Sequence, residues 1–175
     1  MIDEIDRQIL HILQQNARTP NAEIARQVGM APSAVLERIR KLETRGVIQG
    51  YEARIDPEAL GLNLLAFVFV RAEDPEGIRT GEALAQIPEV QEVHHIAGED
   101  CYLAKVRVPD AKTLGRLLRE RFAGSGTVRS TRTTVVLETL RESAQVPVAA
   151  GAGVEAGLAE SEKENSVEKE EEVLS

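Results

Sequence analysis

The chain has 175 residues, of which 42% are hydrophobic and 3% aromatic, with no tryptophan and one cysteine. This length fits one or two modest domains, the lack of aromatics disfavours base-stacking RNA-binding platforms, and a single cysteine excludes a disulfide framework or a multi-cysteine metal site. The formal net charge is −8, but residues 142–175 hold nine acidic side chains and two lysines, so most of the acidity belongs to that segment.

Residues 1–50 have the apolar spacing of three short helices. Thr19 as N-cap and Pro20 at the first helical position begin the second helix, and Gly29 provides its left-handed stop. Pro32 begins the third helix, which ends at Gly46. Three short helices with a tight turn between the second and third predict a helix-turn-helix unit.

The third predicted helix has one apolar side, formed by Val35, Leu36, Ile39 and Leu42. The opposite side is polar and mostly basic, and consists of Ser33, Ala34, Glu37, Arg38, Lys41 and Arg45, with Arg40 on its flank. Such a helix suits the major groove of DNA, although a charged helix side is often only a solvated surface.

We expect Arg38 to read a guanine edge, and Arg40, Lys41 and Arg45 to contact phosphates. Glu37 either accepts from a cytosine or orients Arg38. On this interpretation, Arg38→Ala weakens DNA binding and relaxes base preference.

Residues 47–55 are predicted to be extended, and Asp56-Pro57 ends that segment. Residues 58–63 are expected to form a turn or linker. Residues 51–63 together therefore serve as a hinge strand and linker between two domains.

Residues 64–142 follow a β-α-β-β-α-β pattern. Strands are expected at 64–70, 90–96, 102–108 and 128–137, and helices at 76–87 and 111–122. The first strand is apolar on both faces, so both are expected to be covered. It is also the longest apolar run, far short of the roughly 20 residues that span a bilayer. The pattern predicts an α+β protein with a ferredoxin-like domain, whose open sheet face usually finds a partner.

Residues 143–175 are Ala/Gly-rich and then Glu/Lys-rich, and we expect them to be a disordered acidic tail. A helix over 160–174 would need a partner to be stable. The tail could compete with DNA for the basic helix. The N-terminus is acidic where a signal peptide is basic, so the expected location is the cytoplasm, with no membrane contact.

Several motifs, taken together and in order, resemble the Lrp/AsnC family of bacterial and archaeal transcription regulators over about residues 1–142. In the N-terminal part they are Ile5-Asp6-Arg7, Asn21-Ala22-Glu23-Ile24-Ala25, Leu36-Glu37-Arg38-Ile39-Arg40-Lys41-Leu42-Glu43 and Gly46-Val47-Ile48-Gln49-Gly50-Tyr51. In the second part they are Gly98-Glu99, Tyr102-Leu103, Lys105-Val106-Arg107-Val108-Pro109-Asp110 and Thr131-Arg132-Thr133.

The resemblance implies a winged helix-turn-helix, a hinge, and a βαββαβ ligand-sensing domain of the RAM or ACT-like type. Such proteins form dimers through the sheet, and often tetramers or octamers. They bind amino-acid effectors in clefts between dimers. Carried over to this chain, the effector site comprises Gly98, Glu99, Asp100, Cys101, Tyr102, Thr131 and Thr133.

Two positions depart from the family pattern. Ala31 stands where many relatives have a capping serine before Pro32, and Ser33 is one possible substitute. Cys101 stands where relatives commonly place an aspartate that holds an amino group, and strand alternation directs Asp100 to the other face. This chain therefore binds the family's ligand, a different one, or none.

The leading functional hypothesis is a sequence-specific DNA-binding regulator whose DNA binding or assembly responds to an amino acid or related metabolite. We expect no catalytic residue, no metal and no cofactor besides the effector. One alternative is an architectural, nucleoid-type protein that binds DNA with little sequence choice. The other is an enzyme resembling siroheme decarboxylases, for which His94 and His95 are the relevant residues. Because these histidines are adjacent on a predicted strand, their side chains face opposite sides and cannot bind the same metal ion.

Overall fold

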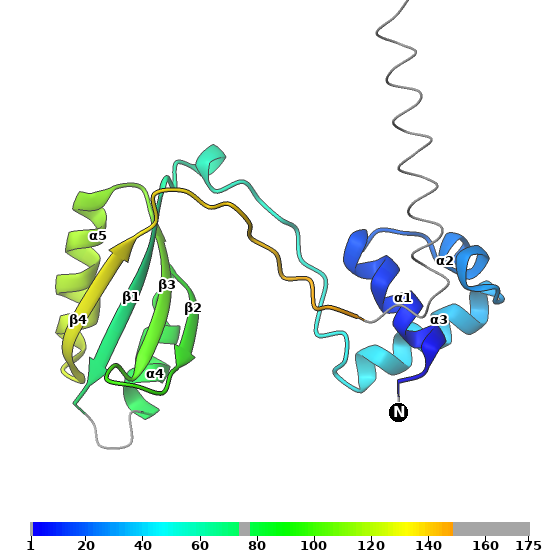
Figure 1. The fold of residues 1–175 in the computed structure, drawn as a ribbon, viewed down its shortest axis with the longest axis horizontal. Helices are drawn as coiled ribbons and strands as arrows, with labels where there is room; N and C mark the ends of the chain where they lie inside the picture. Colours follow the sequence, from blue (N-terminus) through cyan, green and yellow to red (C-terminus); the bar gives the residue numbers. More distant parts are fainter. Residues whose placement is uncertain (1, 74–77, 149–175) are drawn as a thin grey trace, which may run out of the picture. The chain divides into compact units, whose positions relative to one another are not determined.

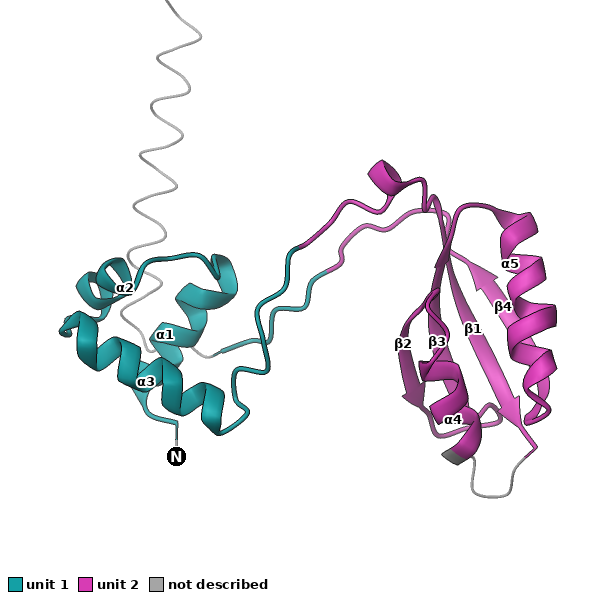
Figure 2. Cartoon of the chain, turned by 180° about the vertical axis from the view of Figure 1, so that it is seen from behind, with its two compact units in different colours: residues 1–53, 143–175 teal, residues 54–142 magenta. Residues whose placement is uncertain are grey.

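The computed structural model describes residues 2–73 and 78–148. The chain divides into two compact units, one of residues 1–53 with 143–175 and one of residues 54–142 (Figure 2). Residues 51–53 and 143–148 group with the helical unit. The remaining expectations for the acidic tail, including a helix over 160–174, lie outside the described residues.

The helical unit contains α1 (Glu4–Gln15), α2 (Asn21–Val28) and α3 (Pro32–Thr44), which confirms the predicted helix-turn-helix (Figure 1). Its core is small, with one or two buried side chains from each helix: Ile9, Ile24, Ala25, Val35 and Ile39. Leu36 was expected on the apolar side of α3 but does not join this core, and it is 37% exposed.

The ends of α2 and α3 follow their sequence signals with one exception. Gly29 adopts φ 68° after α2, and Pro32 occupies the first turn of α3, as predicted. The N-cap of α2 is Pro20, not Thr19. Thr19 lies one residue before the cap position, because the first helical bonds, from the N–H groups of Glu23 and Ile24, are accepted by the carbonyl of Pro20.

The expected hinge strand is not formed. Within the described residues, no segment pairs with residues 47–56, so they join no sheet. The next element is a 3₁₀ turn at Glu58–Leu60. Tyr51 and Ile55 are 50% and 67% exposed. The segment is therefore a linker without regular secondary structure.

The second unit is a four-stranded antiparallel sheet of β1 (Leu64–Ala72), β2 (Val90–His95), β3 (Tyr102–Val108) and β4 (Val128–Val135), in the order β2-β3-β1-β4. Helices α4 (Ile78–Ala85) and α5 (Ala111–Leu117) cover one face (Figure 1). A π-helical turn at Leu118–Phe122 extends α5. This arrangement confirms the predicted ferredoxin-like βαββαβ plan.

The helix-covered face of the sheet contains the core, and the other face is open. Ala66, Val68 and Val70 of β1 are fully buried, whereas Phe67 and Phe69 on the alternate positions are only partly buried. The expectation that both faces of this strand are covered is therefore wrong for the single chain, because both crossover helices lie on the same side.

Charged side chains occupy part of the open face. The ammonium group of Lys105 lies 2.9 Å from a carboxylate oxygen of Glu92 and also pairs with Glu142. Arg107 reaches the same Glu142 at 3.4 Å. Burial alone would lower the pKa of Lys105, but its hydrogen bonds with Glu142 and Glu92 outweigh burial and raise that pKa.

Gly81 of α4 lies directly against the ring of Tyr102. A Cβ atom at Gly81 would come within 2.8 Å of the Tyr102 ring, a distance that real Cβ contacts do not allow. Tyr102 is itself 6% exposed and stacks on His95, with ring centroids 5.0 Å apart. The close approach of α4 to the sheet therefore requires glycine at position 81.

Gly81→Ala is expected to destabilise the sheet-containing unit by about 1–3 kcal/mol, the usual cost of overpacking. Gly115→Ala on α5 is the matched control, because its Cβ would meet only the flexible end of Arg119 at 3.4 Å. That substitution should stabilise the unit by about 0.4–1 kcal/mol. Urea unfolding, followed by hydrogen exchange of the β3 amides, measures both, and equal effects of the two alanines would contradict this packing.

Candidate nucleic-acid interface and ligand site

The exposed side of α3 carries the residues that the sequence proposed for DNA. Ser33, Glu37, Arg40, Lys41 and Arg45 are exposed, and Ala34 is half-buried. On the opposite side, Val35, Ile39 and Leu42 are buried, which fixes which side of the helix faces solvent. The structure therefore brings these predicted residues together on one accessible helix surface.

The charges of Lys41 and Glu37 on this surface remain available to a ligand. Lys41 and Glu37 are 3.8 Å apart, with both side chains about 70% exposed, and exposed pairs of this kind contribute little. The N-terminus of α3 has no side-chain cap, so neither Ala31 nor Ser33 satisfies its first amide groups. Uncapped amides at a helix N-terminus favour anions such as phosphate.

The Arg38 guanidinium pairs with two carboxylates at the start of α1. Its Nη1 lies 2.7 Å from Asp3 Oδ2 and 2.7 Å from Asp6 Oδ1. The Arg38 side chain is 28% exposed and that of Asp6 only 9%. All three residues line a hollow in the surface that also includes Ser33 and Glu37.

The two aspartates are also bound to each other's backbone. Asp3 is the N-cap of α1, and its Oδ1 accepts from the backbone N–H of Asp6 at 2.8 Å. Asp6 Oδ2 in turn accepts from the backbone N–H of Asp3 at 3.2 Å. The hydrogen bond from the N–H of Asp6, the largest cause, and the pairing with Arg38 lower the pKa of Asp3. Hydrogen bonds to Asp3 and Asp6 raise the pKa of Arg38.

Five of the predicted effector residues, 98–102, lie at the turn between β2 and β3, whereas Thr131 and Thr133 lie on β4, on the other side of β1. Gly98 adopts φ 139°, which only glycine takes readily. The turn is closed by the backbone N–H of Ile96, which donates to Cys101 at 2.9 Å, and by that of Cys101, which donates to Val70 at 2.9 Å. Arg71 of β1 donates to the carbonyl of Glu99 at 3.0 Å.

These residues lie on two faces of the sheet. Asp100 accepts from Arg132 at 3.1 Å, and the Arg132 guanidinium lies 3.9 Å from the ring centre of Phe69 on the open face. Tyr102 lies on the helix-covered face, and strand register places Thr131 and Thr133 on that same face. Cys101 is partly buried against the core, as expected of a small apolar residue.

The two adjacent histidines point in opposite directions. His94 Nε2 lies 3.2 Å from Glu92 on the open face, and His95 stacks on Tyr102 on the other. Within residues 2–73 and 78–148, no group of three or more His, Cys, Asp or Glu side chains could hold a metal ion.

Four residues that form contacts in these two sites were not predicted from the sequence: Asp3, Asp6, Phe69 and Arg132. The spacing of Asp3 and Asp6, three residues apart at a helix start, is the signal of a capping box. Pairing of Asp6 with Arg38 has no local signal, because the residues are 32 positions apart. The contact of Phe69 with Arg132 follows only from strand register, in which the two residues are direct partners.

Comparisons with known proteins match both units. Residues 2–43 match the AsnC-type helix-turn-helix domain, and residues 65–146 match the Lrp/AsnC ligand-binding domain. The leucine-responsive regulatory protein of Escherichia coli K12 is 39% identical over 145 residues, covering 81% of this chain and 88% of the relative.

Solved structures are similar over the same span. A transcriptional regulator of Neisseria meningitidis in complex with L-methionine has a TM-score of 0.80 and 26% identity, covering 85% of this chain and 98% of that one. The feast or famine regulatory protein of Mycobacterium tuberculosis, complexed with L-methionine, has a TM-score of 0.78 and 38% identity, covering 83% and 99%.

Arg38→Gln is expected to raise the pKa of Asp3 part of the way towards its usual value, because the N–H of Asp6 remains bound. A carboxyl with a lowered folded-state pKa favours folding above its unfolded pKa, and this contribution is lost as the pH falls through the folded pKa. ¹³C NMR titration of the side-chain carboxyls measures the change. Asp110 is the control, because its lowered pKa arises mainly from hydrogen bonding to Thr113. A wild-type Asp3 that titrates at about 3.9 would contradict the network.

Proposed function

Since the chain belongs to the Lrp/AsnC family of DNA-binding transcription regulators, we propose that it recognises a specific operator and that a free amino acid controls its binding or assembly. The observation that carries this proposal is the exposed polar side of α3 in the same chain as the ligand-binding fold. L-Methionine, which is bound in two similar structures, is the first candidate effector.

On the DNA side, α3 enters the major groove with its N-terminal residues nearest the bases. Ser33, Ala34 and Glu37 lie towards the base edges, where the Glu37 carboxylate accepts from a cytosine amino group. Arg40, Lys41 and Arg45 follow along the helix and contact phosphates. Exposure of these charged side chains supports the assignment.

On the effector side, the ligand occupies the turn of Gly98, Glu99, Asp100 and Cys101, next to Tyr102, Thr131 and Thr133. Asp100 is held by Arg132 on the open face, so an amino acid that needs this carboxylate must displace or share that bond. A ligand there changes DNA binding only if it binds one assembly more tightly than another.

The regulator functions as a dimer in the cytoplasm, with tetramers or octamers as higher assemblies. The open sheet face, with the partly buried Phe67 and Phe69, supports pairing through the sheet. A dimer presents two α3 helices to half-sites about one helical turn apart. None of the helices in the described ranges is long and apolar enough to span a membrane.

The direct test is binding of the full chain to DNA from upstream of its own gene and to a scrambled fragment, at fixed salt, with each of the twenty amino acids in turn. Preference for the upstream fragment, altered by one amino acid, is the expected result. Preference for the upstream fragment that none of the amino acids alters would contradict the proposed control by a free amino acid. Equal binding to both fragments would favour the architectural alternative, and no binding to either would contradict the DNA-binding assignment.

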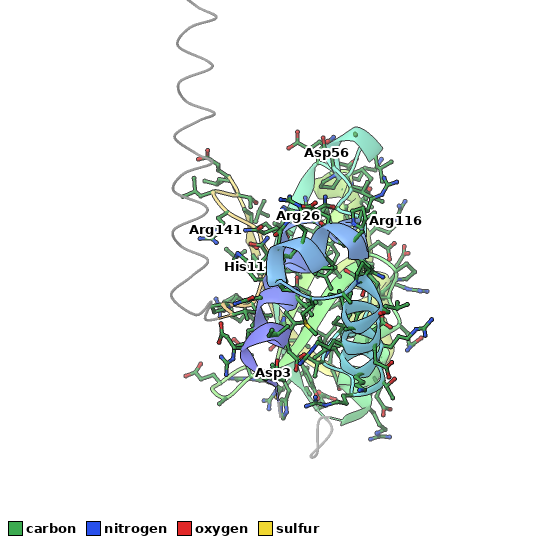
Figure 3. All side chains as sticks on the ribbon, turned by 90° about the vertical axis from the view of Figure 1, so that its right-hand side faces the viewer. Asp3, His11, Arg26, Asp56, Arg116 and Arg141 are labelled. Atoms are coloured by element: carbon green, nitrogen blue, oxygen red, sulfur yellow. The ribbon has the colours of Figure 1, made fainter. Side chains whose placement is uncertain are left out.

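Lys41→Gln is expected to weaken binding by a similar factor for all DNA sequences, because a phosphate contact carries no sequence information. The slope of log affinity against log salt should fall by about 0.9 for the lost contact. Arg116→Gln, on α5 of the sheet-containing unit (Figure 3), is the control and should leave the slope unchanged. Equal slopes for wild type and Lys41→Gln would remove Lys41 from the phosphate contacts.

Removal of residues 149–175 tests whether the acidic segment competes with DNA. The truncation must spare residues 143–148, because Val146 and Gln145 hydrogen-bond to Gln14 of α1, with Val146 N–H to Gln14 Oε1 at 2.7 Å. We expect tighter DNA binding at low salt and a smaller difference at high salt, since salt screens the competition. Replacement of the acidic residues in 149–175 by glutamine should reproduce the effect, and unchanged affinity in both variants would exclude it.

A further inference from the structure

The four carboxylate oxygens of Asp3 and Asp6 form a closed network. One oxygen of each binds the backbone N–H of the other residue, and the remaining two bind the same atom, Arg38 Nη1. The backbone bonds fix the carboxylates on the first turn of α1. The position of the Arg38 guanidinium is therefore set by α1, although Arg38 itself belongs to α3.

Burial makes the contact between Arg38 and Asp6 the stronger part of this network. The Asp6 side chain is 9% exposed and lies against Arg38, which is 28% exposed. A carboxylate in such a place is costly unless it is paired, and one arginine here compensates two of them. If Arg38 turned towards a base edge, two negative charges would remain beside the surface that faces DNA.

We propose that Arg38 is a positioning residue rather than a base reader. It fixes the rotation of α3 on α1, so that Ser33, Glu37 and Lys41 face the DNA, and it neutralises Asp3 and Asp6 in the hollow next to them. Sequence discrimination then falls to the exposed residues of α3. This inference rests on the DNA-binding role proposed above.

The experiment compares Arg38→Gln, Asp6→Asn and the double variant in the full chain. Affinity is measured for the operator and for each of its single-base-pair variants. We expect Arg38→Gln to lower affinity at least about tenfold, because it removes both charge-assisted hydrogen bonds of Arg38 and one such bond is already worth about that factor. The factor should be similar for every DNA. Adding Asp6→Asn should recover part of that loss, because it removes the carboxylate left without a partner.

A base-reading Arg38 gives the opposite pattern. Arg38→Gln would then relax preference at one base pair only, Asp6→Asn alone would have no effect, and the double variant would bind no better than Arg38→Gln. That result would overturn the inference. Arg40→Gln is the matched control on the same helix, and its loss should be unaffected by Asp6→Asn.

A readout without DNA separates this inference from the proposed function. Hydrogen exchange of the α3 amides should be faster in Arg38→Gln and should return towards the wild-type rate in Arg38→Lys, which keeps the charge. Unchanged exchange in Arg38→Gln would overturn the positioning role. Absence of any sequence preference in the wild type would instead contradict the proposed function, while the exchange data would still decide the role of Arg38.

Discussion

The pairing of one guanidinium of α3 with two carboxylates at the start of α1 is the constraint on which the helical unit depends. The apolar core of this unit is small, with Ile9 of α1 packed against residues of α2 and α3, and apolar contacts are not directional. The bonds of Arg38 to Asp3 and Asp6 (Asp3 is labelled in Figure 3) supply direction. They hold the polar side of α3 at a fixed point on the first turn of α1.

In the sheet-containing unit, the two faces of the sheet differ in what covers them. One face is packed by α4 and α5, so tightly that Gly81 has no room for a Cβ atom next to Tyr102. The open face combines partly buried phenylalanines with the charges of Lys105, Glu92 and Glu142. The turn before Tyr102 joins the faces, with Asp100 bound on the open side and Tyr102 on the packed side. A ligand at this turn therefore lies next to both layers.

Local sequence signals predicted the helices and strands well, but they did not predict contacts between residues far apart in the sequence. Pro32, Gly29 and the apolar run of β1 located helices and strands because each signal lies within the element itself. Thr19 is not the cap because α2 begins one residue later than the sequence signal indicated, with Pro20 at the cap position. The open face of β1 was missed because an apolar run does not show on which side the crossover helices pack. The partner of Arg38 could not be predicted, since it depends on how α1 and α3 cross.

The most direct measurement is the crystal structure of the full chain bound to its operator. We expect Arg38 Nη1 to remain within hydrogen-bonding distance of Asp6 Oδ1, while the side chains of Ser33, Glu37 and Lys41 contact the DNA. A guanidinium that has left both aspartates and bonds to the edge of a guanine would contradict it. The same structure would show whether α3 keeps its position on α1 when DNA is bound.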